Sequence, residues 1–485
     1  MSYERTDAQG NIVRGYRHLH HVGYLFCEIE DAAATRGLLA ELAASEVTTD
    51  ETWREKMAKH DTLNVAFTYP GLVKLGWARP FAHERFRDFR QGMYARAVRQ
   101  LGESGEDYPD GWEAALSSGA DVLFIVYGDD PDVRTSRAQD MGLRAERAGM
   151  SQLYYQAADA PASPAEHVVE REHFGFADGF SQPAIDVSVH GTRRGECSAR
   201  GEGAIPVRGP LNWRPRWREI RLGEFLLGFE DEDRMVAGGE DPYNALRHGT
   251  FMVWRKLEQH KDRLEEFLEE AEQRPRDRER LAAKIVGRWK DGTSLVVEPY
   301  QDPPPDSTQP PAMPKNEFDY GSDEHGIACP VGAHVRRANP RVGLKYGTER
   351  TKRHRIIRRG MPYRVADEEG LVFVCFNASI TRQFELIQGH WLMDGDAFGL
   401  GDDQDFLLGH EPGGKMTIPG DRRRPARFLR RPDLPFVTVH GGYYLFMPGI
   451  SALRRIAQGP PSDSALSRLA RWGRATLRRL RSRLP

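Results

Sequence analysis

Short apolar runs alternate along the chain with amphipathic segments, and this pattern predicts strands and helices in turn. In the first third, the pattern predicts strands at 22–30, 63–68, 121–127 and 151–156 and helices at 32–45, 72–75, 86–101 and 136–148. Strand, helix, strand, strand, helix, strand is the order of a ferredoxin-like unit. The first predicted half ends near Ala162, where an Ala- and Pro-rich linker follows the last strand.

The same kinds of segment return later in the chain, separated by longer irregular stretches. They predict strands at 249–257, 371–377 and 442–447 and helices at 258–272 and 381–393. Residues 191–217 are rich in Gly, Arg, Pro and Trp, and residues 302–316 contain six prolines, so both predict loops. We therefore divide the chain into 1–162, 163–460 and a basic amphipathic tail at 461–485.

Composition narrows the functional classes. Charged residues make up 29% of the 485 residues and the net charge is −2, which does not indicate a nucleic-acid binder. The four cysteines are scattered and form no C-x-x-C or C-x-x-C-H, so neither a zinc knuckle nor a covalently attached haem is indicated. No signal peptide or apolar run of transmembrane length is visible, and we expect a cytoplasmic protein.

One segment, 329–341, concentrates candidate chemistry. It reads C-P-V-G-A-H-V-R-R-A-N-P-R, with His334 between Pro330 and Pro340. The two prolines predict a short, stiff piece of backbone. A histidine held in this way can direct one ring nitrogen to a metal while an acceptor holds the other. The neighbouring arginines suit a carboxylate ligand, although a buried histidine beside a basic turn fits the same residues.

A second segment, 173–183, lies far upstream and reads H-F-G-F-A-D-G-F-S-Q-P. Its G-x-x-D-G motif covers residues 175–179. Together with the later segment around His334, it resembles the dye-decolourising peroxidase family. The resemblance extends from about Gly10 to about Gly449. It implies an α+β fold of two ferredoxin-like halves, with antiparallel sheets, peripheral helices and the haem in the second half.

The resemblance also implies a function: reduction of hydrogen peroxide by non-covalent haem b, through a ferryl intermediate that oxidises phenols or dyes. A haem-binding or haem-handling protein without turnover is the alternative. Both functions need His334 as axial ligand, whereas only the peroxidase needs a distal acid–base group and a cation. The family implies Asp178 and Arg358 for these two roles. Asp178 could instead be an ordinary turn residue, and Arg359 is the neighbour most easily confused with Arg358.

Further haem contacts are implied by position. Arg337 matches a residue that contacts a haem propionate, with a surface arginine as the alternative. Leu371 and Phe373 match apolar residues over the distal haem face, with ordinary core packing as the alternative. The second ring nitrogen of His334 needs an acceptor. We prefer Asp405 among five aspartates in the later loop, which are Asp394, Asp396, Asp402, Asp403 and Asp405.

Two further hypotheses concern partners. Bulky donors need a surface relay, for which Trp391 and Tyr346 are candidates, although both could be ordinary packing aromatics. The tail carries seven arginines and no acid from Leu466 onward, with leucines and a tryptophan at helical spacing. This composition indicates contact with a membrane surface or an acidic protein, unless the leucines pack on the enzyme. A homo-oligomer stays open.

Overall fold

The computed structural model describes residues 3–13, 15–16, 18–51, 60–160, 171–179, 181–187, 205–207, 216–237, 245–274, 277–300, 318–344 and 351–460. The tail at 461–485, the Pro-rich segment 302–316, Tyr346 and most of 191–217 therefore lie outside the described residues.

The first half consists of β1 (His21–Ile29), α2 (Ala32–Glu41), β2 (Asp61–Phe67), β3 (Val122–Gly128), α7 (Pro131–Arg147) and β4 (Met150–Asp159). Its strands are antiparallel in the spatial order β2–β3–β1–β4, as in a ferredoxin-like fold. Asp31 and Asp130 fix the starts of the two helices, because each side chain accepts a hydrogen bond from a backbone N–H in the first turn.

The second half repeats this order with longer connections. Its main elements are β9 (Thr250–Gln259), α8 (Lys261–Glu270), α9 (Asp277–Val286), α10 (His334–Ala338), η9 (Lys352–His354), β10 (Ile357–Arg358), β11 (Met361–Val365), β12 (Glu368–Asn377), η10 (Thr381–Leu392) and β15 (Val437–Met447). The strands follow the order β10–β12–β9–β15, and β11 also pairs with β12. The predicted α+β fold of two ferredoxin-like halves is confirmed.

The remaining elements are short and lie around the two halves. They include α1 (Gly10–Val13), η1 (Leu42–Glu46), α4 (Tyr69–Lys74), α5 (Arg87–Gln91), η5 (Ala97–Leu101), α6 (Ala114–Ser117), β5 (Ile185–Asp186), β6 (Ile205–Val207), β7 (Arg216–Arg218), β8 (Ile220–Arg221), η8 (Leu222–Glu224), η11 (Asp396–Phe398), β13 (Lys415–Ile418), β14 (Arg427–Arg430) and α12 (Ile450–Gln458).

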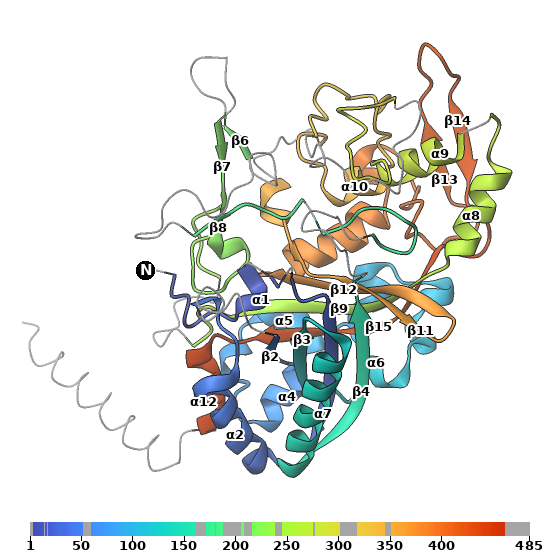
Figure 1. Cartoon of the computed structure of the whole chain (residues 1–485). Coiled ribbons are helices and arrows are strands. Elements are labelled where there is room, and N and C mark those ends of the chain that lie inside the picture. The colour runs from blue at the N-terminus through green and yellow to red at the C-terminus, as the bar shows by residue number, and fades with distance from the viewer. Residues whose placement is uncertain are drawn as a thin grey trace, which may run out of the picture.

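The two halves share one sheet, because β15 pairs with β2 at Phe446 and Phe67. The sheet curls until β11 at one end lies against β4. Aromatic side chains fill the inside of the curl, where Phe26 and Trp254 stand with ring centroids 4.9 Å apart. Figure 1 shows α2, α7 and α12 below the sheet and α8, α9 and α10 above the second half.

One predicted helix is broken in the structure, and the pattern missed two others. The single helix predicted over 86–101 is broken into α5, a 3₁₀ turn and η5, because Gly92 has φ +74° and ends α5. The pattern missed α9, which follows α8, and α12, which follows the last strand and packs against α2.

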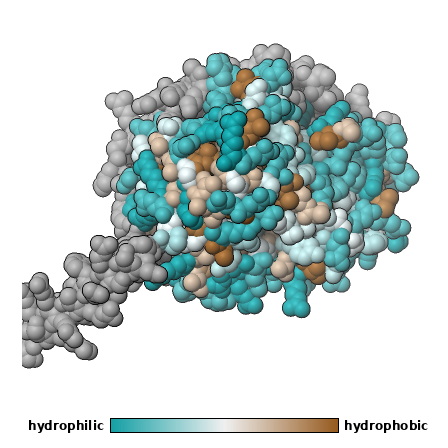
Figure 2. All heavy atoms as spheres, turned by 90° about the horizontal axis from the view of Figure 1, so that it is seen from below, coloured by the Kyte–Doolittle hydropathy of each residue, from teal (hydrophilic) through white to brown (hydrophobic). Residues whose placement is uncertain are grey.

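The face that carries the first-half helices is mostly hydrophilic, with small scattered apolar groups (Figure 2). Leu143 on α7 and Val73 on α4 are exposed apolar side chains of first-half helices. In the described part of the chain, we find no helix with the length and apolarity needed to cross a bilayer.

Candidate active site

A cavity of about 280 Å³ lies against the outer face of the second-half sheet. Its floor is formed by side chains that alternate along strands β9, β12 and β15. These side chains are Arg255, Leu257, Gln259, Leu371, Phe373, Val437 and Val439. The short helix α10 and the π-helix η10 also contribute to its wall. His334, Asp178, Arg358, Leu371 and Phe373, five of the predicted site residues, all line this one cavity.

His334 is the first residue of α10, in the segment between Pro330 and Pro340. Its Nδ1 lies 3.2 Å from Oδ2 of Asp405, which has no exposed surface. The other Asp405 oxygen accepts from the backbone N–H groups of Leu407 and Leu408. Burial alone would raise the pKa of Asp405, but His334 and Arg337 hold it below its ordinary value. An ionised Asp405 therefore orients the imidazole and leaves Nε2 available for a metal.

Asp178 and Arg358 come together from distant parts of the chain. Asp178 lies in a turn between Gly175 and Gly179, whose φ values are +87° and +81°. Arg358 is the last residue of β10, and its Nη1 lies 3.8 Å from Oδ1 of Asp178. The Gln182 side chain holds the Arg358 backbone by two hydrogen bonds of 3.0 Å. A carboxylate and a guanidinium thus share one wall of the cavity.

The structure distinguishes the roles of the adjacent Arg358 and Arg359, which the sequence alone could not do. Arg359 is absent from the cavity lining, and its guanidinium donates to the carbonyl oxygens of Asn11, Ile12 and Val13. Arg359 therefore anchors α1 to β10, whereas Arg358 faces the cavity.

The placement of Arg337 does not fit its predicted contact with a haem propionate. Its side chain has no exposed surface and does not line the cavity. Its guanidinium donates instead to four carbonyl oxygens, which belong to Trp391, Leu392, Asp403 and Asp394. The physical reason is the nearby end of η10, whose last carbonyls lack intrahelical partners and attract a cation.

The cavity lining contains four other arginines, Arg255, Arg288, Arg341 and Arg355, and sequence reasoning predicted none of them as a site residue. Arg341 stands over the Phe318 ring at 5.0 Å, and no acceptor for its guanidinium is present among the described residues. Its backbone has φ +50°, which is rare for a residue with a side chain. Burial and the charge of Arg341 lower the pKa of Arg288 and of Arg355 to about 9. The arginines repel one another, so an anionic ligand would stabilise the group.

Comparison with known proteins identifies the family of the chain. Residues 7–155 match the family model described as the DyP dimeric alpha+beta barrel domain, and residues 229–402 match the model of the Dyp-type peroxidase C-terminal region. The chain belongs to the dye-decolourising peroxidase family. It is a peroxidase, and peroxidases of this family are haem enzymes.

Relatives match over nearly the whole chain. Dye-decolorizing peroxidase msp1 of Mycetinis scorodonius is 27% identical, over 93% of this chain and 87% of the relative. Multifunctional dye peroxidase DyP2 of an Amycolatopsis species is also 27% identical, over 93% and 95%. The solved structure of an ancestral D-type dye decolorizing peroxidase superposes with a TM-score of 0.77 at 26% identity, covering 94% of this chain and 99% of the other.

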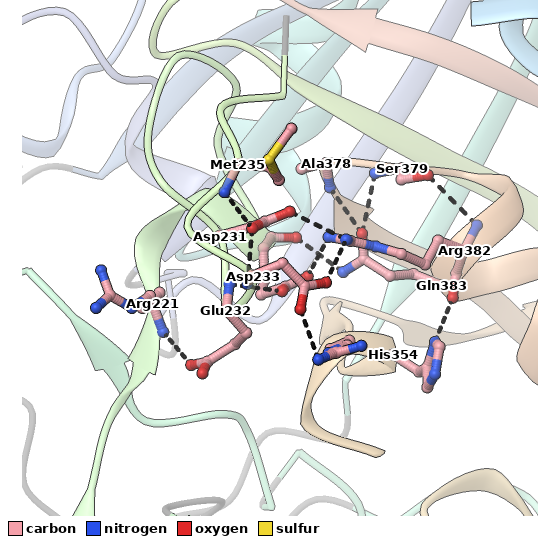
Figure 3. A network of polar contacts seen from close by, with 12 residues as sticks. Arg221, Asp231, Glu232, Asp233, Met235, His354, Ala378, Ser379, Arg382 and Gln383 are labelled. Atoms are coloured by element: carbon pink, nitrogen blue, oxygen red, sulfur yellow. Dashed lines mark hydrogen bonds and ion pairs between the residues drawn. The ribbon is translucent and has the colours of Figure 1, made fainter. Parts of the chain in front are cut away.

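In this peroxidase, the acidic turn at 231–233 and the π-helix η10 hold the basic segment that precedes Arg358 (Figure 3). Arg382 donates to Glu224 at 2.7 Å and to Asp231 at 3.0 Å. Its carbonyl oxygen lies 2.6 Å from Nδ1 of His354, which lines the cavity. Gln383 donates to the carbonyl oxygen of Arg355 at 2.6 Å. The network therefore fixes the backbone that presents Arg355 and, three residues later, Arg358.

Trp391, a relay candidate, is buried at the end of η10. Its ring centroid lies 5.3 Å from that of His354, in an edge-to-face arrangement. The aromatic contact reaches the cavity through His354, but the structure describes no exposed face of Trp391 large enough for a bulky donor. The relay therefore stays a hypothesis.

Proposed function

We propose that this chain is a haem b peroxidase that reduces hydrogen peroxide and oxidises phenolic or dye-like donors. One observation carries the proposal. An Asp405-oriented His334 lines the same cavity as the Asp178–Arg358 pair. Family membership supports peroxide and aromatic donors as substrates.

The residues present fit a haem. His334 would supply Nε2 to the iron, with Asp405 holding the other ring nitrogen. Arg341, helped by Arg288 and Arg355, would hold the two propionate groups, because these buried cations line one cavity and repel one another. We propose Arg341 for the propionate contact in place of Arg337. Leu371 and Phe373 would face the porphyrin. The sequence contains no C-x-x-C-H, in agreement with non-covalent binding.

The distal residues divide the handling of peroxide between them. When bound, haem supplies the two electrons that break the O–O bond, and the donor later restores them. The Asp178 carboxylate accepts the proton of the attacking peroxide oxygen and returns it to the leaving oxygen, which departs as water. The Arg358 guanidinium stabilises negative charge on that leaving oxygen during cleavage. Over the whole reaction, two electrons from the donor and two protons would convert one hydrogen peroxide into two molecules of water.

Absorbance of the purified chain tests this proposal. Haem addition should give a Soret band, peroxide should shift that band transiently, and a phenolic donor should hasten its return. A Soret band that peroxide does not alter would favour a haem-binding protein without turnover. The Asp178–Arg358 pair speaks against that alternative, because haem binding alone does not need it. The absence of a Soret band after haem addition would contradict both functions.

A further inference from the structure

The turn that carries Asp178 is organised around a neighbouring carboxylate, Glu172. Its two oxygens accept from the backbone N–H groups of Phe174 at 3.0 Å and Phe176 at 2.8 Å. The Glu172 backbone closes the same turn, because its N–H donates to the Phe176 carbonyl oxygen at 3.0 Å. Three hydrogen bonds to one residue thus fix the path of the chain two residues before Asp178.

A side chain of the sheet ties this turn to the cavity floor. Gln259, near the end of β9, donates from Nε2 to Glu172 Oε2 at 2.5 Å. Glu172, Gln259 and Asp178 all line the cavity. Gln259 is only 9% exposed, and its Oε1 is buried with no hydrogen-bond partner in the described structure.

The unpaired oxygen indicates why a glutamine stands here. Leaving a buried acceptor unsatisfied costs about 1–3 kcal/mol, and an apolar side chain of similar size would avoid that cost. The contribution of the amide must therefore lie in the bond that it donates to Glu172. The cost of the unsatisfied Oε1 is offset only if the hydrogen bond to Glu172, which holds the turn against β9, contributes to the stability or the activity of the enzyme.

We propose that Glu172 and Gln259 are positioning residues that hold the Asp178 carboxylate opposite Arg358. The proposal rests on the peroxide chemistry proposed above. A carboxylate at position 172 is needed because three donors converge on it. A neutral amide there would turn an N–H group toward at least one donor. The ion pair between His173 and Glu369 reaches the same turn at 3.1 Å but does not join it to the cavity lining, so it serves as a matched control.

Three variants of the haem-loaded enzyme test the proposal. They are Glu172→Gln, Gln259→Met and the control Glu369→Gln. A misplacement of about 1 Å can lower a rate by up to about 100-fold. We expect Glu172→Gln and Gln259→Met to lower kcat/KM for hydrogen peroxide by about 10- to 100-fold while kcat/KM for a phenolic donor stays within about twofold. Glu369→Gln should change neither value by more than about twofold, because its contact lies outside the cavity.

Two further measurements distinguish a positioning role from a general loss of stability or haem loading. Amide hydrogen exchange at Phe174 and Phe176, measured also in the haem-free protein, should accelerate in Glu172→Gln. In an Asp178→Asn background, Glu172→Gln should lose most of its effect on the peroxide step, because the two residues act as one unit. If Glu172→Gln fails to fold or to load haem, Gln259→Met decides the question alone.

The outcomes distinguish this inference from the proposed function. If the wild-type holoenzyme does not react with peroxide, the proposed function fails. If it reacts and both cavity variants match the Glu369→Gln control, the positioning role is wrong while the peroxidase assignment stands. Equal losses toward peroxide and donor, or full additivity with Asp178→Asn, would also overturn the positioning role.

Discussion

The two halves share one topology but use the outer faces of their sheets differently. In the first half, the outer face of β3 carries Val122, Phe124 and Val126, which are buried beneath helices. In the second half, the outer face of β9 begins with Phe251 and Val253 and continues with Arg255, Leu257 and Gln259 along the cavity. Charged and amide side chains on an otherwise buried strand mark the place where packing gives way to a site.

The connections explain the same difference. In the first half, α2 lies on the crossover from β1 to β2 and α7 on the crossover from β3 to β4, and the two helices place Leu38, Leu39 and Met141 on the core. In the second half, nearly a hundred residues separate β9 from β10. That excursion supplies α10 and His334, so the cavity forms between the sheet and a long insertion. A ferredoxin-like unit therefore becomes a binding site by keeping its strands and lengthening one crossover.

The largest expected effect is a loss of haem binding when His334, in the insertion between β9 and β10, is replaced. His334→Ala should abolish stable haem loading while the haem-free protein stays folded, because no other histidine of the cavity lining has a buried carboxylate holding its ring. Soret absorbance and circular dichroism after haem addition check this. Full haem occupancy of His334→Ala with an unchanged Soret position would contradict the axial role of His334 and the location of the haem site in the second half.

The next effect concerns the reaction with peroxide and distinguishes Arg358 from the adjacent Arg359. Arg358→Leu should keep haem but slow the reaction with peroxide by about 100- to 10,000-fold, as should Asp178→Asn, because each removes a positioned group. Rapid-mixing absorbance measures the rate. Arg359→Leu should instead lower stability with a normal rate, since Arg359 bonds to α1. The reverse result for the two arginines would move the catalytic role by one residue.

Phe124 on β3 and Phe373 on β12 occupy corresponding strands of the two halves, so they allow a direct comparison of the two outer faces. Phe124 is fully buried, whereas Phe373 is partly buried and lines the cavity. Phe124→Ala should lower the free energy of unfolding by about 3–5 kcal/mol because it opens a void in a packed core. Phe373→Ala should cost less in the haem-free protein but alter the haem spectrum. Denaturant titration and Soret spectra check both, and equal destabilisation would show that the second face is as tightly packed as the first.

How much of this the sequence could predict depends on whether a feature is local. The strands and the ferredoxin-like order follow from apolar runs. His334, Asp178 and Arg358 lie in short motifs that the resemblance places in order. The contact of Asp405 with His334 lies outside any short motif, since 71 residues separate the two, and the sequence offers five aspartates for this role.

The missed residues depend on geometry that no short pattern contains. Arg341 reaches the cavity because its backbone adopts a left-handed conformation after Pro340. Arg337 turns away because carbonyl groups at the end of η10 lie close to it. Glu172 and Gln259 meet across 87 residues. The sequence does place a polar residue, Gln259, on a strand that is otherwise buried. A search for apolar runs ignores such a residue, although it can indicate a binding site.

Arg341 and Arg337 give the fourth test. A hydrogen bond to a charged group contributes about 1.5–3 kcal/mol, so Arg341→Met should weaken haem affinity by about 10- to 100-fold with little change in haem-free stability. Arg337→Met should do the opposite, because four buried carbonyl oxygens lose their donor. Haem titration and thermal melting of the haem-free protein measure the two effects. Weaker haem binding in Arg337→Met alone would restore the role predicted from sequence.

The smallest expected effect concerns a buried cluster where the halves meet. Nδ1 of His410 lies 3.2 Å from Asp107, and its Nε2 lies 2.6 Å from the Gly102 carbonyl oxygen. Glu103, in the same cluster, pairs with Arg255 of β9. The three acid and histidine side chains lie close enough to bind a metal, but both ring nitrogens of His410 are already engaged. We therefore interpret the cluster as an ionic link between the first half and the cavity wall.

His410→Gln should weaken that link in a pH-dependent way. Burial would lower the pKa of His410, but Asp107 and Glu103 outweigh it and raise the pKa above its ordinary value. A raised pKa means that the stabilising contribution is complete below the ordinary value of about 6.5 and is lost as the pH rises through the folded value. The variant should therefore be less stable than wild type by about 1.5–3 kcal/mol at acidic pH, and the difference should shrink in mild alkali. Denaturant titrations of both proteins at several pH values measure it. A difference that grows with pH would mean that His410 is neutral and that the link is an ordinary hydrogen bond.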